Sequence, residues 1–193
     1  MKKAMRNCAM LPAVLAATVL LPACSEDNVT SDEADVADTD QSTQTVASAL
    51  GAIPDLASFN AALSSAQIGS IFDGPGSYTV LAPNDEAFAA LGEDGAALMD
   101  EPQRPVLIGV LRNHILPGHL TMDDIAAAID ARGGTVTMTT LGQGSVEFTR
   151  DGSGITVSND TGATARLGAT STAATNGVII PLDTVLVPGD PSN

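Results

Sequence analysis

One stretch decides the fold: Tyr78-Thr79-Val80-Leu81-Ala82-Pro83-Asn84-Asp85-Glu86-Ala87-Phe88. Its first part is rich in aromatic and β-branched residues, which predicts a buried strand. Pro83 cannot continue a central strand, and Asn84 is a favourable N-cap, followed by two carboxylates at the positive end of a helix dipole. The stretch therefore predicts a central strand that turns abruptly into a capped helix, which ends at Gly92.

Amphipathic helices are predicted on both sides of this stretch. Apolar residues recur at helical spacing, and hydroxyl residues such as Thr45 and Thr121 stand in N-cap positions. The last of these helices ends at the pair Gly133-Gly134, which favours a left-handed stop. The helical segments predicted outside the opening stretch are 46–53, 56–63, 68–72, 107–111 and 121–132.

The second half of the chain predicts strands. Short runs at 136–141, 145–149 and 155–158 alternate apolar and polar residues and are separated by glycine-rich turns. Asn176-Gly177 predicts a tight turn with positive φ before a last apolar strand over 177–187. Helices first and strands later, without βαβ alternation, predict an α+β fold with a mainly antiparallel sheet.

Three segments together resemble the fasciclin (FAS1) domain. Residues 78–88 are similar to its first signature, residues 111–121 to its Tyr-His region and residues 176–186 to its closing signature, in the same order and spacing. The resemblance covers residues 45–188. It implies a β-wedge of two packed, mainly antiparallel sheets with helices over one side, and a role in adhesion to proteins, matrix or glycans.

The resemblance also implies a binding segment. By analogy with the family, that segment is Asn113, His114, Leu116 and His119. Asn113 stands where the family has the tyrosine of its Tyr-His pair. The stretch 171–175 lacks the Asp-Ile pair of members that engage integrins, so integrin-type recognition is not expected.

The first 23 residues have the parts of a secretory signal peptide. A basic start precedes an apolar run at 9–21, which is too short to span a membrane. Leu21-Pro22-Ala23-Cys24 then resembles a bacterial lipobox, with Cys24 as the lipidated first mature residue. By resemblance to Gram-negative sorting, Ser25 favours the outer membrane. The alternative is a simple signal peptide cut nearby, which leaves a soluble secreted protein.

An acidic tether is predicted between the anchor and the domain. Residues 24–44 are rich in Asp and Glu and lack apolar periodicity, so they cannot bury enough surface to order themselves. The domain follows over 45–188, and 189–193 form a tail. The whole chain has 8 Lys+Arg against 23 Asp+Glu, a net charge of −15, which excludes nucleic acid as the obvious partner.

The sequence shows little catalytic chemistry. His114 lies among apolar residues and is predicted to be a hydrogen-bonded core residue, whereas His119 is predicted in an exposed turn. Their spacing does not match the i, i+4 spacing of a helical zinc pair. The acids Asp123-Asp124 fit a helix start, and Asp183 fits a structural carboxylate. No motif indicates a catalytic residue, a metal site or a cofactor.

The sequence therefore predicts a non-enzymatic lipoprotein of the cell envelope that acts in adhesion. Its expected partners are the membrane, through the lipid anchor, and an extracellular or periplasmic protein or polysaccharide. The chain has no Trp and a single Tyr, which argues against a glycan groove built on aromatic stacking and leaves polar contacts. Two alternatives stay open: a carrier of an apolar ligand such as a carotenoid, which some family members bind, and a hydrolase.

Overall fold

The computed structural model describes residues 43–74, 76–152 and 154–187. The helices are α1 Val46–Ala52, α2 Ala57–Ala66, α3 Asp85–Ala90, α4 Gly92–Leu98, α5 Arg104–Asn113 and α6 Met122–Arg132, with short 3-10 helices at Pro54–Leu56, Gly69–Asp73 and Glu101–Gln103. The strands are β1 Tyr78–Pro83, β2 Ile115–Pro117, β3 Thr135–Thr139, β4 Ser145–Asp151, β5 Gly154–Asn159, β6 Thr164–Arg166, β7 Thr172–Ala174 and β8 Gly177–Leu182.

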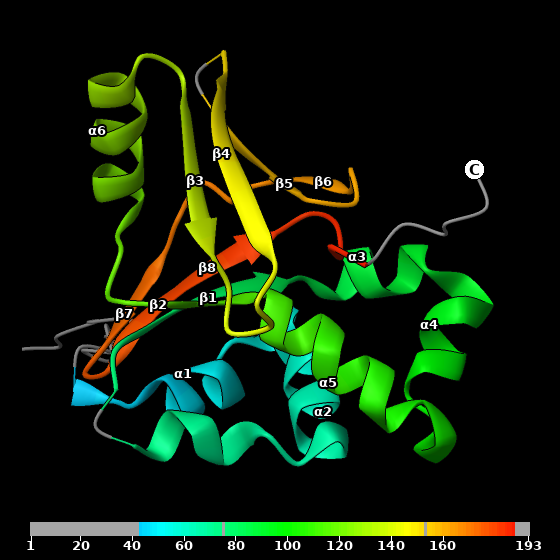
Figure 1. The fold of residues 1–193 in the computed structure, drawn as a ribbon. Coiled ribbons are helices and arrows are strands. Elements are labelled where there is room, and N and C mark those ends of the chain that lie inside the picture. The colour runs from blue at the N-terminus through cyan, green and yellow to red at the C-terminus, as the bar shows by residue number, and fades with distance from the viewer. Residues whose placement is uncertain (1–42, 75, 153, 188–193) are drawn as a thin grey trace, which may run out of the picture. The chain divides into compact units, whose positions relative to one another are not determined.

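Two four-stranded sheets form the centre of the fold (Figure 1). Sheet A has the order β2-β1-β8-β7, and sheet B has the order β3-β4-β5-β6. All neighbouring strands are antiparallel except β1 and β8, which run parallel and pair from Tyr78–Gly177 to Pro83–Leu182. The α+β class and the mainly antiparallel sheets predicted from the sequence are confirmed.

Sheet A is buried on both faces. On one face, Val80 of β1 and Ile179 of β8 pack with Phe59 and Leu63 of α2 and with residues of α1 and α5. Figure 1 shows α1, α2 and α5 gathered on that side. On the other face, residues such as Leu81 meet sheet B. This double burial explains why both central strands are almost continuously apolar.

The second core lies between the two sheets and under α6. Ile125 and Ile129 of α6 pack with Val146 and Phe148 of β4 and with Ile180 of β8. Sheet B is buried on this face alone, so its strands alternate between buried and accessible residues. The wedge of two sheets with helices over one side, which the resemblance implies, is therefore the observed architecture.

The turn before β8 needs glycine for space rather than for its dihedral angles. The prediction of positive φ at Asn176-Gly177 is wrong, because neither residue is among the positive-φ residues of the described chain. A Cβ on Gly177 would instead collide with the backbone oxygen of Tyr78 and lie 2.8 Å from Cγ2 of Val46. The parallel pairing of β8 with β1 brings these backbones together.

Several elements differ from the sequence predictions. Gly92 ends α3 with a φ of 58°, as predicted, but a further short helix, α4, begins at the same residue. The helix predicted at 68–72 is a 3-10 helix, Gly69–Asp73. The last strand ends at Leu182 instead of running to 187, because Asp183 leaves the ladder and accepts a hydrogen bond from the Arg166 N–H.

The predicted signal peptide, Cys24 and the tether up to residue 42 lie outside the described residues, as does the tail. Among the residues described, no single helix has the length and apolar character to cross a membrane. The segments Val46–Ala52 and Pro54–Ala66 are together long and apolar enough for a membrane span, but the chain bends by 108° between them.

Candidate functional site

A surface groove lies where sheet B meets the end of β8. The start of α6, the ends of β4 and β6, the start of β5 and the end of β8 line it, and its volume is about 690 Å³. That volume falls within the range of ligand sites in proteins, roughly 300–1,000 Å³. The apolar part of its wall includes Met122, Ala126, Ile155, Leu167 and Pro181.

One arginine of the groove is held by a carboxylate of α6. The Nε of Arg150 donates to Oδ1 of Asp130 at 2.9 Å, and its NH2 donates to Oδ2 at 2.8 Å. These hydrogen bonds lower the pKa of Asp130 and raise the pKa of Arg150, so both groups stay charged at neutral pH. The bidentate geometry fixes the guanidinium plane at the groove wall.

A second arginine pairs across sheet B. Arg166 on β6 forms an ion pair with Asp151 on β4, and both side chains are more than half exposed. The backbone N–H of Arg166 donates to Asp183 Oδ1 at 2.7 Å, and Thr184 Oγ1 donates to the same oxygen at 3.1 Å. Asp183 thus makes the local hydrogen bonds of a structural carboxylate, and its side chain is exposed.

The acids at the start of α6 form a cap, as predicted. Thr121 Oγ1 accepts from the Asp124 N–H at 3.1 Å, and Asp124 Oδ2 accepts from the Thr121 N–H at 2.9 Å, a complete capping box. The hydrogen bonds from Thr121 lower the pKa of Asp124. Asp123 at this helix start also lines the groove and adds a negative charge there.

His114 is a core residue. Its side chain is 0% exposed, and Nδ1 lies 2.8 Å from the carbonyl oxygen of Val110. Nε2 accepts a hydrogen bond from the Leu186 N–H at 3.0 Å, which assigns the proton to Nδ1. Burial lowers the pKa of His114 to about 4. The neutral ring therefore joins α5 to the chain after β8, and His114 is a hydrogen-bonded core residue, as predicted.

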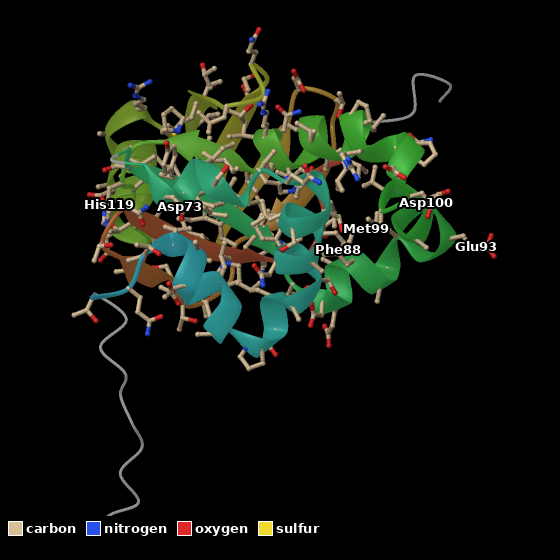
Figure 2. All side chains as sticks on the ribbon, turned by 90° about the horizontal axis from the view of Figure 1, so that it is seen from below. Asp73, Phe88, Glu93, Met99, Asp100 and His119 are labelled. Atoms are coloured by element: carbon tan, nitrogen blue, oxygen red, sulfur yellow. The ribbon has the colours of Figure 1, made fainter. Side chains whose placement is uncertain are left out.

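The other residues of the predicted binding segment do not share one surface. Leu116 is 0% exposed. Asn113 is half-buried, and its Oδ1 accepts from Thr140 Oγ1 at 2.8 Å beside the β3–β4 turn. His119 is exposed at the edge of the molecule (Figure 2). A partner of this segment would therefore meet Asn113 and His119, and the binding role stays a prediction.

The fasciclin domain model matches residues 54–188. The chain belongs to the fasciclin domain family. Among solved structures, a FAS1 domain pair from the insect cell adhesion molecule Fasciclin I is similar, with a TM-score of 0.65 and 16% sequence identity. The alignment covers 75% of this chain and 51% of that one, so the chain spans about half the length of the domain pair. At this identity the likeness shows the fold.

The fasciclin fold is associated in general with adhesion and protein interaction rather than with catalysis. The described residues that line the groove include no His, Cys, Ser or Thr, and its acidic residues are Asp123 and Asp183. Within residues 43–74, 76–152 and 154–187, no group of three or more His, Cys, Asp or Glu side chains could hold a metal ion. The groove is equipped to bind through paired charges and apolar contacts.

Sequence reasoning missed the groove of this fasciclin domain. Met122, Arg150, Arg166 and Pro181 lie far apart in the chain and meet only because α6, sheet B and β8 converge. One signal was present: Arg150 follows Val146 and Phe148 in the alternation of β4 and so continues the buried face of the strand. An arginine at a core-facing position indicates a partner or a groove at that end of the strand.

Proposed function

We propose that this protein is a non-enzymatic recognition domain held at the cell envelope by a lipid on Cys24. The groove is the surface through which it binds a partner outside the cytoplasm. The observation that carries the proposal is the groove wall, in which Arg150, paired with Asp130, stands beside apolar side chains. Membership of the fasciclin family supports the same role.

The lipid anchor is supported by the sequence around the cysteine. Leu21-Pro22-Ala23-Cys24 follows the apolar run directly, and two or more acyl chains suffice for durable membrane attachment. Cell fractionation of the wild type and the Cys24→Ser variant tests it. We expect the wild type in the membrane fraction and the variant in the soluble fraction. Unchanged membrane association of the variant would contradict the anchor.

The groove is tested by capture of partners from native envelope extracts. Ala126→Glu places a charged side chain in the groove, whereas Ala127→Glu makes the same change at an exposed position of α6. We expect Ala126→Glu to lose the captured partner and Ala127→Glu to keep it, with matching circular dichroism spectra. Equal capture by both variants would remove the groove from the proposal. A coloured or extractable lipid in the purified protein would favour the carrier alternative.

A further inference from the structure

The charges of the groove are out of balance once their existing partners are counted. Arg150 and Arg166 already form ion pairs with carboxylates that stand outside the groove lining. The acids of the lining, Asp123 and Asp183, are exposed and form no ion pair with any residue that the structure describes. The groove therefore presents uncompensated negative charge, in a chain whose net charge of −15 already attracts cations.

The two unpaired acids belong to different elements of the same groove. Asp123 stands in the first turn of α6, and Asp183 directly follows β8. The wall that they share also includes the apolar side chains of Met122, Ile155 and Pro181. A ligand in the groove therefore meets apolar surface as well as negative charge. A cation that also has an apolar part is complementary to both.

Asp183 offers one open oxygen to a ligand. Its Oδ1 accepts from the Arg166 N–H at 2.7 Å and from Thr184 Oγ1 at 3.1 Å, whereas no described residue donates to its Oδ2. A carboxylate oxygen has about two lone-pair sites, so Oδ1 is filled. A guanidinium pairs best with both oxygens of a carboxylate, but an ammonium is a compact charge that can use one. Asp183 therefore favours an ammonium group over a guanidinium.

A lysine side chain combines the properties that the groove requires. Its methylene stem packs along apolar surface while its ammonium reaches a charged group in water. The domain of a second copy cannot supply such a side chain, because the lysines of this chain are Lys2 and Lys3, in the predicted signal peptide. A lysine ligand therefore comes from a different protein.

We propose that the groove binds a lysine-bearing segment of another protein, whose ammonium groups pair with Asp123 and Asp183. The inference rests on the proposed function, because it names the partner chemistry of the same groove. Both carboxylates are exposed, so each pair should change the affinity by roughly two- to fivefold. The negative charge of the chain should also speed the approach of a basic segment, and added salt should weaken this effect.

An NMR titration with defined peptides tests the ammonium, because it detects weak binding and locates it. The protein is the full chain with Cys24→Ser, and the probe is the end-blocked peptide Gly-Lys-Leu-Lys-Gly. The comparison peptides carry acetyl-lysine or arginine in place of both lysines. We expect the lysine peptide to shift resonances of groove residues such as Ile155 and Leu167. The acetylated peptide should bind much more weakly, because acetylation removes the charge.

Paired variants separate the groove carboxylates from the charge of the whole chain. Asp123→Asn/Asp183→Asn preserves the shape of both side chains and should weaken binding of the lysine peptide roughly tenfold. Glu93→Gln/Asp94→Asn removes the same charge from the exposed start of α4, where Figure 2 shows Glu93, and should bind like the parent. No binding of the lysine peptide, tighter binding of either comparison peptide, or equal weakening by both variants would overturn the proposal.

Partner capture from envelope extracts separates this inference from the proposed function. Ala126→Leu fills part of the groove without adding a charge, and acetylation of the extract neutralises the lysines of its proteins. Loss of the partner with Ala126→Leu, with Asp123→Asn/Asp183→Asn and after acetylation would support the proposal. Loss with Ala126→Leu, but unchanged capture in the other two arms, would overturn the lysine ligand and keep the groove. Unchanged capture in all three arms would overturn both.

Discussion

Acidification should destabilise the folded domain through one buried histidine. His114 is held neutral in the core, where Nδ1 donates to Val110 and Nε2 accepts from the Leu186 N–H. Burial lowers its pKa from the ordinary 6.5 to about 4. Between these values the unfolded chain binds a proton that the folded chain refuses, so protonation favours unfolding. The contribution of the neutral His114 ring to the free energy of unfolding is therefore fully present above pH 6.5 and is lost progressively as the pH falls to about 4.

The size of this effect follows from the shift. A difference of one pKa unit corresponds to about 1.4 kcal/mol, so the free energy of unfolding should fall by about 3 kcal/mol across the window. Domains of this kind are stable by about 5–15 kcal/mol, which makes the loss easy to measure. The lowered pKa values of Asp124 and Asp130 act below their ordinary value of 3.8, outside this window.

Urea unfolding at a series of pH values measures the loss. Circular dichroism is the suitable signal, because the chain has no Trp and one Tyr. His114→Gln removes the titrating ring, and His119→Gln removes the exposed histidine instead. The stability difference between wild type and His114→Gln should shrink from pH 6.5 to 4.5, whereas His119→Gln should follow the wild type. A constant difference, or a His114 ring that titrates near 6.5 by NMR in the folded protein, would refute this reasoning.

Further predictions concern local parts of the fold. Thr121→Ala should lower the unfolding free energy by about 1 kcal/mol through the lost capping box, whereas Thr170→Ala should leave it unchanged in urea titrations. Leu116→Ala should lower the free energy of unfolding by about 2–5 kcal/mol, since the side chain is fully buried between the sheets. A decrease of less than about 1 kcal/mol would contradict that packing. Gly177→Ala should abolish cooperative thermal unfolding, because its Cβ meets the Tyr78 backbone, whereas Gly51→Ala meets nothing and should fold normally.

Local signals made much of the fold predictable. Asn84 caps α3 by accepting the Ala87 N–H at 2.8 Å, and Thr121 caps α6 in the same way, so both helix starts could be located from a few neighbouring residues. His114 could be placed in the core because its neighbours are apolar. These features depend on interactions within one turn or on simple periodicity, which the sequence displays directly.

Surfaces could not be predicted in the same way. The groove joins α6, β4, β6 and β8, and its charged wall depends on Arg150 meeting Asp130 across two elements. The alternation Thr135-Val136-Thr137-Met138-Thr139 is visible in the sequence. Which residues lie opposite one another across the four strands of sheet B depends on the strand register, which the sequence does not display. The φ predicted for Gly177 was wrong for the same reason, since its neighbour is Tyr78 in a distant part of the chain.

The three segments that carry the family resemblance meet in the interior of the fold. Residues 78–83 pair in parallel with 177–182, and the carbonyl of His114 accepts from the Leu81 N–H at 2.8 Å. The same histidine holds Leu186 through its ring. Such residues determine how the chain folds, and the same fold serves any partner. The groove draws mainly on residues 122–169, between the second and third segments, and is completed by Asn84 from the first segment and by residues 181–183 from the third. Specificity should therefore vary there among proteins that share this fold, while the resemblance itself reports architecture.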